Sequence, residues 1–262
     1  MTILDFTAKK RDGIPISMVT SYDSWSASLI AESDVDCILV GDSAAMIMHG
    51  HDSTLPVDTR QMAVHTAAVR RGAPDAFIIA DLPFLSFRSG LERSMENIAL
   101  LMRAGANAVK LEGAAGNLEL IRHTVESGVP VMGHLGLTPQ SVHRLGGFRI
   151  QGRGEEAAAG ILEDALSLEA AGCFAMVLEA VPGEGAGGIT SALKIPVIGI
   201  GAGIDVDGQV LVLQDLLGLT SGFKPKFVRN FLDGAALVKE ALNSYHSEVS
   251  RRTFPGKKEW YE

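Results

Sequence analysis

Eight short apolar segments recur along the chain, and most are followed by a longer stretch with helical spacing. The segments are mostly continuous runs of apolar residues, as expected of strands buried on both faces of a parallel sheet. Each ends in a polar or glycine-rich turn, which separates it from the next helix. The predicted strands span residues 14–21, 37–41, 77–80, 108–111, 130–134, 174–178, 196–201 and, more weakly, 209–213.

The stretches between these strands predict helices. Several of them stop at a glycine, which favours the left-handed conformation that ends many helices. Eight strand and helix units in 262 residues predict a single (β/α)8 TIM barrel, a fold of about 250 residues. An open, doubly wound sheet has the same local pattern. The predicted helices span residues 25–32, 59–71, 91–104, 117–127 and 155–171, with a shorter one near Thr190.

No linker or low-complexity segment interrupts this pattern, so we expect residues 1–262 to form one barrel domain. A long helix is predicted over residues 227–249, and a tail with three aromatic residues follows it. The barrel has little core left for these aromatic side chains. We therefore expect the C-terminal helix and tail, residues 227–262, to dock on a neighbouring subunit.

Charge and composition narrow the classes of partner. The net charge is −8, the wrong sign for general attraction to nucleic acid or to anionic membranes. No run of about 18 apolar residues predicts a membrane span. Cys37 and Cys173 lie within apolar strands without metal or redox spacing, as expected of buried thiols in a reducing compartment. These features predict a cytoplasmic protein.

Carboxylates end five of the first six predicted strands. Chemistry in barrels of this type lies at the C-terminal ends of the strands. Acidic residues also begin turns and cap helices, and this simpler interpretation suits Asp23 and Asp58. It suits the others less well, because no helix follows them immediately. The strand-end residues are Asp23, Asp42, Asp81, Glu112 and Glu179, with His134 at the end of the fifth strand.

The fourth strand indicates which side chains face inward. Lys110 and Glu112 are two residues apart and share one face of the strand, while Val109 and Leu111 share the other. Because the helix-facing side should be apolar, Lys110 and Glu112 are expected to face the barrel axis. Carboxylates that converge there need a compensating cation, and an oxygen donor set favours Mg²⁺ or Mn²⁺ over Zn²⁺.

Such a cation would chelate a 2-oxo acid and stabilise its enolate, with a further carboxylate as base. His134 is equally compatible with a proton carrier and with a simple hydrogen-bonded histidine. The glycine-rich segment 199–203 lacks the full dinucleotide fingerprint, which favours close packing at the barrel rim, or backbone room for a bulky ligand, over a nucleotide site.

Eight ordered motifs closely resemble the ketopantoate hydroxymethyltransferase family, and the resemblance runs from about residue 16 to residue 255. The specificity comes from the combination of motifs rather than from any one of them. They are VGDS at 40–43, GHDSTLPV at 50–57, HTAAV at 65–69, ADLPF at 80–84, VKLEG at 109–113, GHLGLTPQ at 133–140, LE at 178–179 and IGIGAG at 198–203.

The resemblance implies a barrel of the phosphoenolpyruvate and pyruvate superfamily. It also implies transfer of a one-carbon unit from 5,10-methylenetetrahydrofolate to 3-methyl-2-oxobutanoate, giving 2-dehydropantoate on the route to pantothenate and coenzyme A. Members of the family form decamers, so a homo-oligomer, specifically a decamer, is expected. The residues that match the family's sites are Asp42, Asp81 and Glu112 for one Mg²⁺ per subunit, Asp42, Ser43, Asp81, Lys110 and His134 for the 2-oxo acid, and Glu179 for the general base.

Two departures from the family pattern lie outside these positions. Ala44 and Ala45 replace the usual Leu-Gly, and residues 183–188 are unusually glycine-rich. The second departure predicts a mobile rim beside Glu179. Two alternative functions remain open: another Mg²⁺-dependent 2-oxo acid lyase or mutase of the same superfamily, and a non-catalytic metabolite-binding barrel. The first is disfavoured because such lyases employ a cysteine-bearing loop.

Overall fold

The computed structural model describes residues 1–220, 222 and 224–261. The chain divides into two compact units, Met1–Leu211 and Val212–Glu262. The first unit holds all eight strands and every residue that the sequence nominates for the site. The second holds the helices α10 (Leu213–Leu216) and α11 (Gly234–Ser250).

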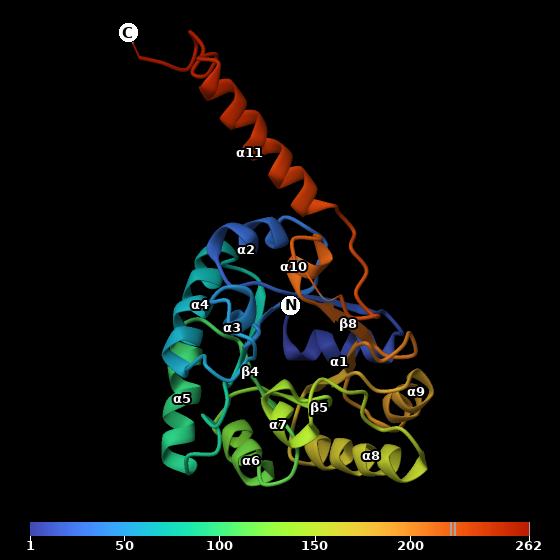
Figure 1. Ribbon diagram of the computed structural model, residues 1–262. Coiled ribbons are helices and arrows are strands. Elements are labelled where there is room, and N and C mark those ends of the chain that lie inside the picture. Colours follow the sequence, from blue (N-terminus) through green and yellow to red (C-terminus); the bar gives the residue numbers. More distant parts are fainter. Residues whose placement is uncertain (221, 223, 262) are drawn as a thin grey trace. The chain divides into compact units, whose positions relative to one another are not determined.

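The strands of the first unit form a closed barrel in which each strand pairs in parallel with its neighbours in sequence, and β8 closes the ring against β1 (Figure 1). This confirms the (β/α)8 prediction and excludes the open sheet. The strands are β1 (Ile16–Thr20), β2 (Cys37–Val40), β3 (Phe77–Asp81), β4 (Ala108–Glu112), β5 (Val131–Gly136), β6 (Ala175–Glu179), β7 (Val197–Ile200) and β8 (Gly208–Leu211).

Helices surround this barrel (Figure 1). Asp23 and Asp58 begin two of them as N-caps, each accepting a backbone N–H at 2.8 Å, which confirms the simpler interpretation of both residues. The helices of the first unit are α1 (Ile3–Arg11), α2 (Ser24–Ala31), α3 (Ala44–Ile47), α4 (Thr59–Gly72), α5 (Leu91–Arg103), α6 (Leu118–Glu126), the 3-10 turn η1 (Pro139–Ser141), α7 (Val142–Leu145), α8 (Glu155–Ala170) and α9 (Gly183–Ala192).

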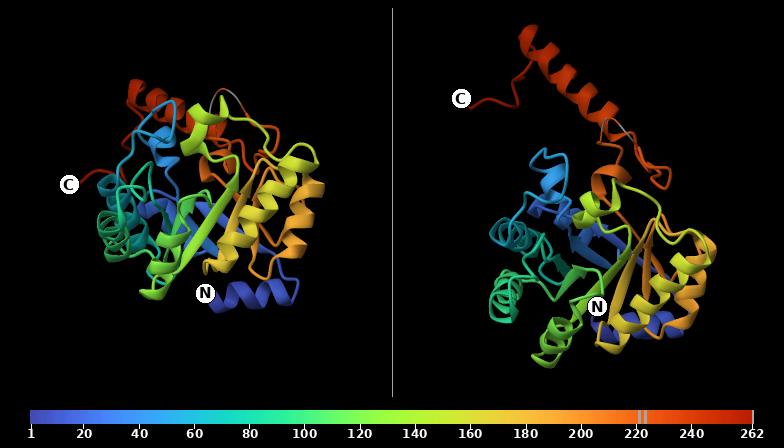
Figure 2. Two further views of the ribbon diagram at one scale, coloured as in Figure 1. Left: turned by 90° about the horizontal axis from the view of Figure 1, so that it is seen from below. Right: turned by 60° about the horizontal axis from the view of Figure 1, so that its bottom comes forward.

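Helix α1 lies at one end of the barrel and was not predicted from the sequence (Figure 2). Its Phe6 is fully buried, with ring centroids 5.3 Å from Phe77 and 5.1 Å from Phe174. Both partners stand at the N-terminal ends of strands, so α1 closes that end with aromatic packing. A local signal existed in the sequence, since Asp5 Oδ2 accepts from Thr2 N at 2.6 Å as in a capping box.

The glycine-rich segment 183–188 is helical and forms most of α9, and its mobility stays a prediction. Close packing explains some of its glycines. A Cβ on Gly203 would lie 2.8 Å from Gly183 Cα, and a Cβ on Gly187 would lie 3.1 Å from Asp205 Cβ. The close approach of Gly203 to Gly183 agrees with the close packing expected at segment 199–203.

The predicted helix over residues 227–249 begins seven residues late, at Gly234. The preceding residues bond to α10 instead: Phe231 N donates to Leu216 O at 2.8 Å, and Asn230 Nδ2 donates to Asp215 O at 2.6 Å. These bonds take the backbone out of a helical path. In the described ranges, no helix is both long enough and apolar enough to cross a bilayer.

Candidate active site

The parallel register brings the nominated side chains to the C-terminal end of the barrel. Asp81 lies opposite Lys110, and Glu112 lies opposite His134. Lys110 and Glu112 are almost fully buried and point into the barrel with their neighbours, as predicted from the period of two. The contributing positions are Asp42 and Ser43 after β2, Asp81 in β3, Lys110 and Glu112 in β4, His134 in β5 and Glu179 in β6.

Lys110 is the central cation of this cluster. Its Nζ lies 3.0 Å from Asp81 Oδ1 and 3.2 Å from His134 Nδ1. Burial alone would lower the pKa of Lys110, but Asp81, Glu112 and Asp42 outweigh it and raise that pKa. Lys110 is therefore a permanent ammonium, suited to offsetting the carboxylate of a substrate.

His134 is a neutral histidine. Burial, followed by the charge of Lys110, holds its pKa well below the usual range. Since the ammonium of Lys110 donates to Nδ1, the proton of the ring is on Nε2. That nitrogen lies 3.3 Å from Glu179 Oε2. Nε2 forms no hydrogen bond with any residue that the structure describes, and because the ring is neutral we expect it to orient Glu179 rather than to carry a proton.

Three carboxyl groups of the cluster bind protons unusually well. Burial raises the pKa of Asp42 to about 7 and that of Glu179 to about 8, and it raises the pKa of Glu112 well above its ordinary value. The charge of Asp81 raises the pKa of Asp42 further. The cluster thus holds more acid groups than one lysine can neutralise, which is the condition for binding a cation.

Gln140 joins two of these acids and was not nominated from the sequence. Its Nε2 donates to Asp42 Oδ2 at 2.8 Å, and its backbone N donates to Glu112 Oε2 at 3.0 Å. It lies in η1, beyond β5, at the end of the motif GHLGLTPQ. That motif brings it to the strand ends, but no spacing rule could show which carboxylates it reaches.

Tyr22 supports Ser43 from the end of β1. The Tyr22 hydroxyl and Ser43 Oγ lie 2.8 Å apart, and the Tyr22 side chain is buried. His65 Nδ1 donates to the Tyr22 carbonyl at 2.7 Å and so fixes this turn. Ser43 therefore has a defined rotamer at the mouth of the barrel.

No cluster of three or more metal-ligating side chains is formed within residues 1–220, 222 and 224–261. Asp42 and Asp81 are nevertheless adjacent, since Asp42 N donates to Asp81 Oδ2 at 3.0 Å. The donors are all carboxyl oxygens in a buried site that gains excess negative charge when these acids ionise. This chemistry fits a hard divalent cation such as Mg²⁺, and it does not fit a thiolate or imidazole metal site.

The two thiols are outside this site. Cys37 and Cys173 are free and buried, and burial raises the pKa of both, that of Cys173 to about 12. Both lie at the N-terminal ends of strands, Cys37 at the start of β2 and Cys173 just before β6. Neither offers a nucleophile or acid to a substrate.

Comparison with known proteins extends over the whole chain. The ketopantoate hydroxymethyltransferase family model matches residues 1–257. A 3-methyl-2-oxobutanoate hydroxymethyltransferase from Bdellovibrio bacteriovorus is 63% identical over 260 residues, covering 99% of both chains. One from Coxiella burnetii is 56% identical over 256 residues, covering 97% of this chain and 96% of the other.

Solved structures share the fold at low identity. Phosphonopyruvate hydrolase in complex with oxalate and Mg²⁺ aligns with a TM-score of 0.62 at 12% identity, covering 99% of this chain and 93% of the other. This similarity concerns the barrel alone. The family model covers almost the whole chain, and full-length relatives are far more similar in sequence than these solved structures. The chain therefore belongs to the ketopantoate hydroxymethyltransferase family.

Proposed function

We propose that this protein transfers a hydroxymethyl group from 5,10-methylenetetrahydrofolate to 3-methyl-2-oxobutanoate and forms 2-dehydropantoate. The observation that carries the proposal is the 63% identity, over 99% of both chains, to a 3-methyl-2-oxobutanoate hydroxymethyltransferase. The arrangement of acids and one lysine at the barrel mouth is compatible with this reaction, because the substrate must lose a carbon-bound proton before it can attack a one-carbon unit.

Glu179 is the proposed general base. Its pKa of about 8 lies near neutrality, where a base combines availability with proton affinity. In the proposed sequence Glu179 takes the C3 proton of the 2-oxo acid. The electron pair left on C3 then attacks the methylene carbon of the folate iminium, forming the new carbon–carbon bond and returning the electrons of the iminium to nitrogen. Cleavage of the bond between this carbon and the folate nitrogen, with one water molecule supplying the hydroxyl group to carbon and a proton to nitrogen, then releases tetrahydrofolate and 2-dehydropantoate.

Lys110, Ser43 and the carboxylates bind the 2-oxo acid in this proposal. Lys110 offsets the carboxylate charge of the substrate, and Ser43 donates its hydroxyl proton from a position fixed by Tyr22. Asp42, Asp81 and Glu112 would hold one Mg²⁺. When bound, Mg²⁺ polarises the keto group and stabilises the negative charge that develops as C3 loses its proton.

Two other functions fit the site less well. A carbon–carbon or carbon–phosphorus lyase of this superfamily would employ a thiol near the substrate, and both cysteines are buried within the barrel wall. A non-catalytic binding barrel has no need of a carboxyl group whose pKa is near neutrality beside a neutral histidine. Product formation from the two substrates separates all three functions.

Deuterium exchange at C3 of 3-methyl-2-oxobutanoate, followed by NMR in D₂O with Mg²⁺, tests the base directly. Glu179→Gln should lower the exchange rate by about 10²- to 10⁴-fold, the usual contribution of a general base. Glu184→Gln, which alters an exposed glutamate at the start of α9, is the matched control. Unchanged exchange in Glu179→Gln would remove Glu179 from this role.

A homo-oligomer, a decamer as in the family, is the proposed assembly, and the C-terminal helix and tail are its proposed contact. The support is the exposed apolar surface of α11, where Leu242 is 63% and Tyr245 is 58% exposed. Light scattering on the full chain and on Leu242→Glu tests this: the variant should be smaller. The cytoplasmic location stays a prediction.

A further inference from the structure

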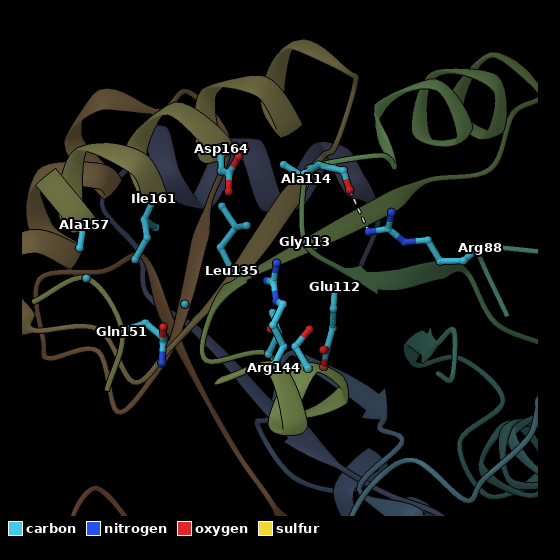
Figure 3. A pocket seen from close by; sticks show the side chains of 15 residues that line it. Arg88, Glu112, Gly113, Ala114, Leu135, Arg144, Gln151, Ala157, Ile161 and Asp164 are labelled. Atoms are coloured by element: carbon cyan, nitrogen blue, oxygen red, sulfur yellow. Dashed lines mark hydrogen bonds between the residues drawn. The ribbon is translucent and has the colours of Figure 1, made fainter. Parts of the chain in front are cut away.

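A pocket of about 460 Å³ lies beside the carboxylate cluster, within the first unit. Glu112 forms part of its wall, together with the ends of β4 and β5 and the helices α7 and α8 (Figure 3). Its volume is within the range of small-molecule sites, about 300 to 1,000 Å³. A ligand in this pocket would therefore lie next to a 2-oxo acid held by the cluster.

Two arginines from different elements line the pocket. Arg144 extends from α7 into the pocket, and Arg88 reaches it from the loop after β3 (Figure 3). Arg88 Nη2 donates to the Ala115 carbonyl at 2.8 Å, which holds its guanidinium at the pocket wall. Burial, followed by the charge of Arg144, lowers the pKa of Arg88, so the two positive charges act on one another.

These arginines are not neutralised by ion pairs. The ion pairs formed among the described residues involve other side chains, and none includes Arg88 or Arg144. Glu112 and Asp164 also line the pocket, and the charge of Arg144 acts on Asp164, but within the described ranges neither acid forms an ion pair with an arginine. Guanidinium groups bind carboxylates in a planar, two-point geometry.

The other residues that line the pocket indicate the chemistry of the rest of the ligand. Leu135 and Ile161 provide an apolar surface, and Thr138, Ser141 and Gln151 provide neutral hydrogen-bonding groups. A suitable ligand has a flat apolar body, an amide and at least one carboxylate. The p-aminobenzoyl-glutamate half of a folate has these features, and it adjoins the methylene carbon that must reach the 2-oxo acid.

We propose that this pocket binds the p-aminobenzoyl-glutamate half of the folate co-substrate, with the glutamate carboxylates on Arg88 and Arg144 and the ring between Leu135 and Ile161. This assignment rests on the proposed function, which supplies the folate. It adds the place and the chemistry of folate binding.

The experiment compares tetrahydrofolate with tetrahydropteroate, which lacks the glutamate. Dissociation constants are measured by calorimetry for the wild type, for Arg88→Gln/Arg144→Gln and for Arg149→Gln, an exposed arginine outside the pocket lining. The double variant should bind tetrahydrofolate at least about tenfold more weakly, as expected for lost charge-assisted bonds. Its affinity for tetrahydropteroate, which keeps only the benzoate carboxylate, should fall much less, and Arg149→Gln should match the wild type for both.

A second variant distinguishes the loss of arginine contacts from misfolding of the protein. Arg88→Lys/Arg144→Lys keeps both charges, so it should retain most of the affinity for tetrahydrofolate. Its affinity should also depend more sharply on salt concentration than that of the glutamine variant. Equal weakening of both ligands in the glutamine variant, or no weakening, would overturn the pocket assignment even in a protein that forms 2-dehydropantoate. Arginine-dependent binding of tetrahydrofolate without product formation would instead overturn the proposed function, while the assignment of the pocket to folate would remain valid.

Discussion

His134 Nε2 lies 3.3 Å from Glu179 Oε2, with the imidazole neutral and its other nitrogen occupied by Lys110. The histidine therefore places one ring nitrogen beside the proposed base from a neighbouring strand, without a hydrogen bond between them. Glu179 ends β6, and Ala180, which follows it, has a left-handed φ of 49°. Such a backbone conformation is costly for alanine and is found at functional sites, where the surrounding structure maintains it.

His134→Ala should weaken proton removal through the base. A donor to the ionised carboxylate favours ionisation, so its loss raises the pKa of Glu179. The acidic limb of the pH profile for C3 exchange should then move to higher pH, with a rate about tenfold lower at pH 7, the effect of about one pKa unit. His123→Ala, at an exposed position of α6, is the control. A profile with an unmoved acidic limb would contradict the orienting role.

The metal-free protein should lose stability as pH rises from about 5 to 8. Folded Glu179 keeps its proton up to a pKa of about 8, whereas the unfolded chain releases it near pH 4.3. The folded state therefore binds more protons in this window, and stability falls with increasing pH. Urea denaturation at several pH values measures the slope. Glu179→Gln should flatten it and Glu184→Gln should not; equal slopes in all three proteins would contradict the raised pKa.

Mg²⁺ should reverse this loss. A cation beside Asp42 and Glu112 compensates the charges that burial disfavours, so Mg²⁺ should raise the melting temperature at pH 8 and have little effect at pH 5, where these groups are protonated. Calorimetric titration of Mg²⁺ provides a readout that is independent of turnover. Asp42→Asn should abolish the effect, and Asp75→Asn, at an exposed turn, should retain it. Equal stabilisation of Asp42→Asn would argue against the site.

The barrel and its strand ends were predictable because their signals are local. Apolar runs, most of them continuous, located all eight strands, the eighth more weakly. The residues at the strand ends identified the cluster, because the C-terminal ends of parallel strands lie on one side of a barrel. Helices without a clear apolar face, such as α1, were not predicted from the sequence. The start of α11 was wrong because bonds to α10, formed only in the folded unit, compete with helix extension.

Most residues of the site could be predicted from the sequence, but the hydrogen bonds among them could not. The nominated residues lie together, but the bond from Gln140 to Asp42 spans 98 positions in the sequence. Arg88 and Arg144 likewise line one pocket although they come from separate segments, after β3 and after β5. Loop residues carry no periodicity, so their partners follow from tertiary structure and not from spacing.

Phe6→Ala should destabilise the protein by about 3 to 5 kcal/mol, the usual cost of emptying a buried aromatic position. The ring fills the end of the barrel between Phe77 and Phe174, where no other side chain of α1 is buried. Leu4→Ala alters a residue of the same helix that is 75% exposed and should change stability by less than about 0.5 kcal/mol. Urea denaturation of both variants checks this, and similar values for the two would show that α1 does not seal the barrel.

Gly203→Ala and Gly188→Ala should act in opposite directions although both add one methyl group. At Gly203 the backbone has a φ of 83°, and the new Cβ would lie 2.8 Å from Gly183 Cα. Strain and overlap together should cost about 1 to 3 kcal/mol. The collision would also displace the start of α9 and hence the chain that follows Glu179.

Gly188 lies within α9, has no atom within 4 Å of its would-be Cβ and faces solvent. Alanine there should stabilise the helix by about 0.5 to 1 kcal/mol, because glycine is the poorer helix former. Thermal unfolding of the two variants, with C3 exchange as a second readout, checks both effects. Destabilisation by Gly188→Ala would mean that the segment needs glycine for movement, as the sequence alone had suggested, and that its helical state is not the one that supports turnover.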